Sequence, residues 1–145
     1  MKYLLFLLPC LIASCSVVQS SKTDFIFAQS ATVTVSRVVD ADTFETMVDA
    51  DTMTVRVLNV DTFESRRGDR LTTQAAKARI SHDSALSLGK QAKAFADSLL
   101  RTKSVLIQRQ AGQPNFDIFG RLLRVVSIDG KEYPALLKAR GFVVP

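Results

Sequence analysis

The sequence contains no tryptophan and one histidine, and both of its cysteines fall within the first 15 of 145 residues. Because they are Cys10 and Cys15, the rest of the chain has no thiol for an internal disulfide or a metal site. The single histidine, His82, lies in a polar stretch, and we interpret it as a surface residue. The apolar run at 3–12 is about ten residues long, too short to cross a bilayer as a helix. Because the rest of the chain has neither a disulfide nor a thiolate metal site, the folded domain must be stable by packing alone.

The first residues predict an export signal. Lys2 precedes the apolar run, which ends in Leu-Ile-Ala-Ser before Cys15. This pattern resembles the lipobox of bacterial lipoproteins, in which the signal is cut before the cysteine and the cysteine carries a lipid. We expect an exported protein anchored through Cys15 to a membrane of the cell envelope; a secreted protein cut near Ala13 or Ser14 is the alternative. The chain then has three parts, a signal peptide at 1–14, a tether at 15–30 and a folded domain at 31–145.

The size and charge of the chain limit its organisation and its partners. A length of 145 residues suits one domain. Its formal net charge of +5 favours a polyanionic partner such as DNA or RNA, with an anionic lipid surface as the alternative. No protein partner is evident in the sequence, and we expect a monomer.

The patterning predicts a domain that is mainly β with helices. Five segments have the composition and alternation of strands, at 32–39, 43–48, 52–60, 104–110 and 122–128. Between the third and fourth, one apolar stripe with helical spacing is formed by Leu88, Ala92, Phe95, Ala96 and Leu99. A short helix is predicted at 131–140. This layout matches a five-stranded OB-fold barrel, an α+β domain with a helix between strands three and four.

A long polar connection is expected at 65–87, with a helical turn or two at 71–80. It is rich in arginine and lysine. We interpret most of these charges as a solvated loop, and a surface that attracts phosphates is the alternative.

Three acidic residues are candidates for holding a cation. Asp42, Asp61 and Glu64 offer oxygen ligands with no histidine or cysteine nearby, which favours Ca²⁺, Mg²⁺ or Mn²⁺ over Zn²⁺. Taken alone, the Asp-Ala-Asp sequence at 40–42 also suits a polar turn between strands. The second copy, at 49–51, is interpreted as such a turn.

Two arginines are candidates for binding phosphate. Arg56 lies in the middle of a predicted strand, and Arg121 follows Gly120 at the start of another. A planar guanidinium can bind two phosphate oxygens at once. A surface ion pair is the alternative for either residue.

Taken together, these residues resemble the staphylococcal-nuclease-like (thermonuclease) family. The stretch 43–64 with Arg56 resembles its central motif, and Asp-Ile-Phe-Gly-Arg at 117–121 resembles its second motif. The resemblance implies an OB barrel and a Ca²⁺-dependent nuclease acting on DNA and RNA. It implies Ca²⁺ binding by Asp42, Asp61 and the backbone carbonyl of Thr62. It also implies that Glu64 is the general base or orients water, and that the catalytic arginines holding the phosphate are Arg56 and Arg121.

The chain departs from the family pattern at four positions. Ala41 replaces a usual Gly, and Phe63 replaces a usual Pro, which we expect to loosen the loop that carries Glu64. Ile118 and Phe119 replace Lys and Tyr residues that contact phosphate in the family, so that residues 117–120 serve mainly to place Arg121. We therefore expect a working nuclease with a weak or altered grip on its substrate. A catalytically silent OB module that binds nucleic acid, and a structural lipoprotein of the cell envelope, are the alternatives.

Overall fold

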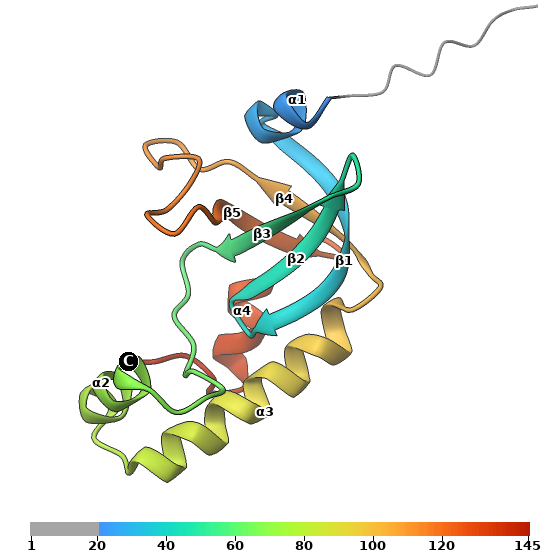
Figure 1. Cartoon of the computed structure of the whole chain (residues 1–145). Coiled ribbons are helices and arrows are strands. Elements are labelled where there is room, and N and C mark those ends of the chain that lie inside the picture. Colours follow the sequence, from blue (N-terminus) through green and yellow to red (C-terminus); the bar gives the residue numbers. More distant parts are fainter. Residues whose placement is uncertain (1–20) are drawn as a thin grey trace, which may run out of the picture.

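Five strands close into a mixed β-barrel in the computed structural model, which describes residues 21–145 (Figure 1). The predicted signal peptide and Cys15 lie outside the described residues. The strands pair in the order β3-β2-β1-β4-β5, and a parallel pairing of β3 with β5 closes the barrel. The predicted α+β fold with an OB-type barrel is confirmed. The strands are β1 (Ser30–Asp40), β2 (Thr43–Val48), β3 (Asp51–Val57), β4 (Ser104–Gln108) and β5 (Leu122–Ile128), with a two-residue β6 (Lys131–Glu132) beside β5.

The long first strand serves both halves of the barrel. The first part of β1 pairs with β4, and its second part pairs with β2. The β1–β2 register shifts between Val35 and Arg37 and again between Val38 and Asp40. Such irregularities bend a strand and raise its twist, which allows one strand to turn a barrel corner. They also bring the end of β1, with Asp40, to the rim of the barrel.

The barrel interior follows the alternation of the sequence. Val55 and Val57 are 0% and 1% exposed, whereas Arg56 between them points to the other side, as predicted. Val35, Phe44 and Leu122 are each 0% exposed in the same core cluster. Successive strand residues point to opposite faces, so burying these valines places Arg56 on the outer surface.

Two helices connect β3 to β4, where one helix and a polar loop were expected. They are α2 (Asp69–Ala78) and α3 (His82–Leu100). The helical turn or two expected at 71–80 corresponds to α2, but the polar loop expected over the rest of 65–87 is wrong, because α2 is longer than predicted and α3 begins at His82. The physical reason is that Leu71, Gln74 and Ala75 share one face of α2 and are buried, so the segment folds against the domain. His82, expected in the loop, is instead the first residue of α3 and is partly exposed.

The α3 helix packs against β1 at one end of the barrel, and α4 (Tyr133–Ala139) packs beside β5 and β6 (Figure 1). The predicted apolar stripe is buried in the barrel core at Ala92 and Ala96. Its other members are partly buried: Phe95 and Leu99 pack against the same core, and Leu88 packs against a second, smaller core cluster. The rest of the buried face is formed by Ala85, Gly89 and Leu100.

A short helix within the predicted tether packs on the barrel. This is α1 (Lys22–Phe27), which begins with a capping box between Ser21 and Asp24. Its Phe25 and Ile26 pack against the main core, and the Ile26 carbonyl accepts a 2.7 Å hydrogen bond from buried Arg124. No helix within residues 21–145 combines the length and apolar character needed to cross a membrane.

Candidate functional site

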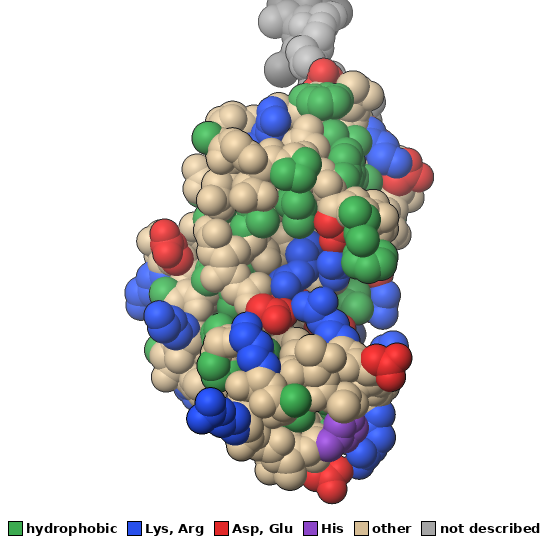
Figure 2. Space-filling model, turned by 90° about the vertical axis from the view of Figure 1, so that its left-hand side faces the viewer, with side chains coloured by type: hydrophobic (Ala, Val, Ile, Leu, Met, Phe, Trp, Pro, Cys, Tyr) green, Lys and Arg blue, Asp and Glu red, His purple; other side chains and the backbone are tan. Residues whose placement is uncertain are grey.

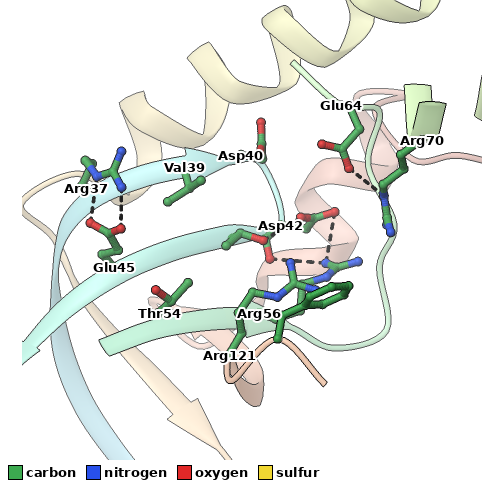
Figure 3. A pocket seen from close by; sticks show the side chains of 12 residues that line it. Arg37, Val39, Asp40, Asp42, Glu45, Thr54, Arg56, Glu64, Arg70 and Arg121 are labelled. Carbon is green, nitrogen blue, oxygen red and sulfur yellow. Dashed lines mark hydrogen bonds and ion pairs between the residues drawn. The ribbon is translucent and has the colours of Figure 1, made fainter. Parts of the chain in front are cut away.

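The candidate site is an open hollow of about 310 Å³ on the outer surface of the barrel. Asp42, Arg56, Glu64 and Arg121, four of the six predicted site residues, line it together with Arg70 (Figure 3). Asp61 and Thr62 lie beside the hollow and contact Asp42, Arg56 or Arg70. Figure 2 shows basic and acidic side chains side by side in the middle of one face of the molecule. The fold thus brings the predicted site residues from separate segments of the chain to one place.

Asp42 ties the barrel to the loop that follows β3. It lies in the turn between β1 and β2 and is 6% exposed. Its Oδ2 accepts hydrogen bonds from the Thr62 amide at 3.0 Å and from the Thr62 hydroxyl at 2.9 Å, while Oδ1 accepts one from Thr43 at 3.0 Å. A buried carboxylate requires such partners or a cation. These contacts hold residues 61 and 62 against the end of the barrel.

Arg56 connects the two acids that were predicted to bind metal. Its Nη1 lies 3.0 Å from Asp42 Oδ2, and its Nη2 lies 3.4 Å from Asp61 Oδ1. The side chain is 13% exposed, and Nη1 also donates to the Val57 carbonyl at 3.1 Å. These contacts hold the guanidinium, and the Arg56 side chain lines the hollow.

The loop that carries Glu64 is held by Phe63, contrary to the expected loosening. Phe63 is 3% exposed and belongs to a second core cluster with Leu71 and Ala75 of α2. Burying a phenylalanine removes a large apolar area from water, which stabilises a contact by roughly 1.5–3 kcal/mol. The aromatic side chain therefore anchors the loop by packing, where a proline would do so by restricting the backbone.

Gln74 adds a polar clamp on either side of Phe63. Its Nε2 donates to the Thr62 carbonyl at 2.9 Å, and its Oε1 accepts from the Glu64 amide at 2.9 Å. Gln74 is 5% exposed. A buried side-chain amide with both ends satisfied fixes the backbone that it bridges. The position of Glu64 therefore depends on the packing of α2 against this loop, which the sequence did not reveal.

Glu64 lies near three other acids and one arginine. Its Oε1 is 2.6 Å from Arg70 Nε, and its side chain is 30% exposed. Burial raises the pKa of the Glu64 carboxyl above its ordinary value, and the negative charge of Asp40 raises it further, while Arg70 opposes these effects. A carboxyl with a raised pKa is a better proton acceptor once ionised.

The turn at 117–120 places Arg121. Asp117 Oδ1 accepts from the amides of Phe119 and Arg121, both at 2.9 Å, and Oδ2 accepts from Arg121 Nε at 2.7 Å. Gly120 has a φ of +76°, which glycine adopts without steric cost. Burial acts to raise the pKa of Asp117, but these hydrogen bonds from Arg121 and Phe119 hold it below its ordinary value. Phe119 is 74% exposed, and Arg121 Cζ lies 5.4 Å from its ring centroid.

The turn at Ala41 is supported by a residue that the sequence did not single out. Ala41 is buried, and its backbone is not among the described positions with positive φ, so the missing glycine causes no strain there. Its carbonyl accepts a 2.6 Å hydrogen bond from the hydroxyl of Tyr133, which is 0% exposed. Burial raises the pKa of the Tyr133 phenol, which remains protonated and donates this bond.

The donor atoms fit a hard divalent cation in type and in charge. The carboxylates of Asp42 and Asp61 and the carbonyl of Thr62 are oxygen ligands. Two guanidinium groups, those of Arg56 and Arg70, pair with carboxylates at this site. The site has four carboxylates, which leaves an excess of two negative charges; they belong to Asp40, Asp42, Asp61 and Glu64. Within residues 21–145, no three His, Cys, Asp or Glu side chains are grouped as a ready metal site. Asp42 and Asp61 are instead engaged by Arg56 and Arg70.

Sequence reasoning missed Arg70 and Gln74, both on α2. The available signal was the helical spacing of Leu71, Gln74 and Ala75, which the surrounding polar residues obscured. A scan against protein-family models and a search of curated proteins each found no match to this chain. The function is therefore inferred from the site itself.

Proposed function

We propose that this protein is a calcium-dependent nuclease that hydrolyses phosphodiester bonds of DNA, RNA or both. The observation that carries the proposal is the convergence of Asp42, Arg56, Glu64 and Arg121 on one open hollow. These residues come from a turn, a strand, a loop and a second turn, so their meeting is a property of the fold. Carboxylates beside fixed guanidinium groups are the parts that phosphodiester hydrolysis requires.

Arg56 and Arg121 are the proposed phosphate-binding residues. Arg121 is held through Nε by Asp117, and no hydrogen bond within residues 21–145 uses its two terminal nitrogens. Arg56 is held by backbone and carboxylate contacts and is already oriented. Preorganised donors stabilise the charge that develops on phosphate oxygens, at about 3 kcal/mol for each well-placed donor.

Glu64 is the proposed general base. Arg70 engages Oε1, and Oε2 is the oxygen that accepts a proton from the attacking water. The water oxygen forms a bond to phosphorus, the bond from phosphorus to the leaving oxygen breaks in line with it, and the leaving oxygen takes up a proton from solvent, which reaches the open hollow. In the family that the sequence resembles, the bond broken is P–O5′ and the product carries a 3′-phosphate. Asp42, Asp61 and the Thr62 carbonyl would hold a Ca²⁺ ion, which supplies charge neutralisation at the phosphate when bound.

The proposed enzyme acts in the cell envelope. This part rests on the sequence around Cys15, which predicts export and a lipid anchor. The exposed Ile118 and Phe119 carry no charge, so the rim offers less electrostatic grip on a polyanion than lysine would. We therefore propose a nuclease with modest substrate affinity.

The test is cleavage of plasmid DNA and of RNA by the purified protein lacking residues 1–14, with Ca²⁺ or with a chelator. We expect cleavage only with Ca²⁺, and a loss of about 10²–10⁴-fold in Glu64→Gln. Arg56→Ala should lose a similar factor, whereas Arg67→Ala, which removes an exposed arginine outside the hollow, should retain activity. Full activity in Glu64→Gln, or no cleavage under any condition, rejects the proposal.

One observation favours a silent nucleic-acid-binding module as a second candidate. Each proposed catalytic group is already paired, Arg56 with Asp42, Glu64 with Arg70 and Arg121 with Asp117. Salt-sensitive binding of DNA without turnover would identify this second function.

A further inference from the structure

The α2 helix places an arginine directly between two acids of the candidate site. Arg70 Nη2 lies 2.7 Å from Asp61 Oδ1, and Arg70 Nε lies 2.6 Å from Glu64 Oε1. Figure 3 shows Arg70 on the far side of the hollow from Arg37, with Glu64 pointing toward it. One guanidinium thus bridges a proposed metal ligand and the proposed general base.

This position is determined by the packing of the helix behind it. Leu71, next to Arg70 in the chain, is 0% exposed and packs with Phe63. Gln74, one turn further, is clamped to the backbone on both sides of Phe63. The start of α2 is therefore fixed relative to residues 61–64, and Arg70 reaches both carboxylates with its side chain 54% exposed.

Asp61 already has positive partners before any metal is present. Its Oδ1 faces Arg70 at 2.7 Å and Arg56 at 3.4 Å. A divalent cation bound by Asp61 would lie within a few ångströms of the same guanidinium group, and like charges at such a distance repel strongly in a partly buried site. Metal binding at Asp61 therefore favours movement of a guanidinium away from it, and Arg70 is 54% exposed whereas Arg56 is 13% exposed and held by the backbone.

We propose that Arg70 is a resident countercation that competes with the divalent metal for Asp61. In the metal-free protein it pairs with both Asp61 and Glu64 and offsets part of their negative charge. When metal binds, the exposed guanidinium of Arg70 is displaced from Asp61 toward solvent. This inference rests on the proposed function, because it takes Asp61 as a metal ligand.

The experiment is a calorimetric titration of Ca²⁺ into the purified protein without nucleic acid. The test variant is Arg70→Gln, and the matched control is Arg67→Gln, which removes one positive charge from the same segment. Arg67 pairs with Asp83 and does not line the hollow. We expect Arg70→Gln to bind Ca²⁺ about fivefold more tightly than wild type, the change that corresponds to removing one partly exposed ion pair. Arg67→Gln should stay within about twofold of wild type.

A second variant and a second readout complete the test. Arg70→Lys keeps the charge and should bind Ca²⁺ with near wild-type affinity. In the absence of metal, Arg70→Gln should unfold at a lower temperature than Arg67→Gln, and Ca²⁺ should raise its unfolding temperature more. Both results are expected if the guanidinium charge occupies the place of the metal.

The outcomes separate this inference from the nuclease proposal. Equal or weaker Ca²⁺ binding in Arg70→Gln than in Arg67→Gln overturns the competition, even if the wild type is an active nuclease. Tighter binding in Arg70→Gln with no cleavage of nucleic acid by any variant supports the competition and rejects the nuclease. Absence of Ca²⁺ binding in every variant overturns the inference together with the metal site.

Discussion

The backbone carbonyl of Glu64 lies so close to Gly89 that a β-carbon on Gly89 would be 2.0 Å from the carbonyl oxygen. The Phe63 carbonyl oxygen would be 2.8 Å from the same atom. The α3 helix therefore passes directly against the loop that carries the proposed base. Only a residue without a side chain permits this approach, because the atoms in the way are backbone and cannot rotate aside.

Gly89→Ala should destabilise the protein by roughly 1–3 kcal/mol, the usual cost of overpacking. In an ordinary helix interior the same change stabilises by about 1 kcal/mol, so the sign of the effect is diagnostic. Urea unfolding measures it, and nuclease activity should fall with the displaced Glu64. Gly68→Ala is the control, because a β-carbon there meets nothing within 4 Å. A stabilising Gly89→Ala would contradict the close contact.

Gln74→Glu should lower the free energy of unfolding of the protein by about 2 kcal/mol or more. The new carboxylate can accept from the Glu64 amide but cannot donate to the Thr62 carbonyl, and it adds a buried negative charge. Thermal unfolding measures the loss. Gln91→Glu, an exposed glutamine on α3, makes the same chemical change without burial and should alter stability little. Similar losses in both variants would show that the clamp contributes nothing.

Asp117→Asn should lower the free energy of unfolding by about 1 kcal/mol at neutral pH. The charged contact with Arg121 Nε is lost, while an oxygen remains to accept from the backbone amides. The pKa of Asp117 in the folded protein is below its ordinary 3.8, so its contribution to stability is complete above 3.8. That contribution disappears as the pH falls through the lowered pKa. The stability difference between wild type and Asp117→Asn should therefore vanish in acid, as unfolding at a series of pH values would show. A difference that persists at the lowest pH would contradict this assignment.

Arg124→Met should release α1 from the barrel with little change in overall stability. Arg124 is 2% exposed and donates to the carbonyls of Leu123 and Ile26, both at 2.7 Å. Burial lowers the pKa of its guanidinium, and a buried charge carries a desolvation cost that a methionine side chain does not. Hydrogen exchange should accelerate at the amides of Phe25 and Ala28, which are bonded within α1. Unchanged exchange at both amides would show that Phe25 and Ile26 hold the helix without Arg124.

The strands were predictable because their burial pattern is local. Residues 43–48 and 122–128 match β2 and β5 at both ends, since alternation along a strand is visible in the sequence. The turn at 49–51 was likewise predicted, and Asp49 and Ala50 both have positive φ there. The β3 strand ends at Val57, three residues before the predicted end, where the chain turns toward Asp61.

The α2 helix was not predictable to the same degree. Its buried face has one large apolar residue, Leu71, with a glutamine and an alanine. Gln74 is buried only because the Thr62 carbonyl and the Glu64 amide, about ten residues earlier in the chain, satisfy both ends of its amide. No local pattern contains that information, since a polar residue is expected to be exposed.

The sequence by itself determined the barrel, the outward direction of Arg56 and the identity of the candidate residues Asp42, Asp61, Glu64 and Arg121. Only the tertiary structure decided which charges meet, namely Arg70 with Asp61 and Glu64, and Arg56 with Asp42 and Asp61. The physical reason is the range of the interactions. Strand alternation is set by neighbouring residues, whereas ion pairs over a few ångströms depend on how α2, α3 and the barrel pack together.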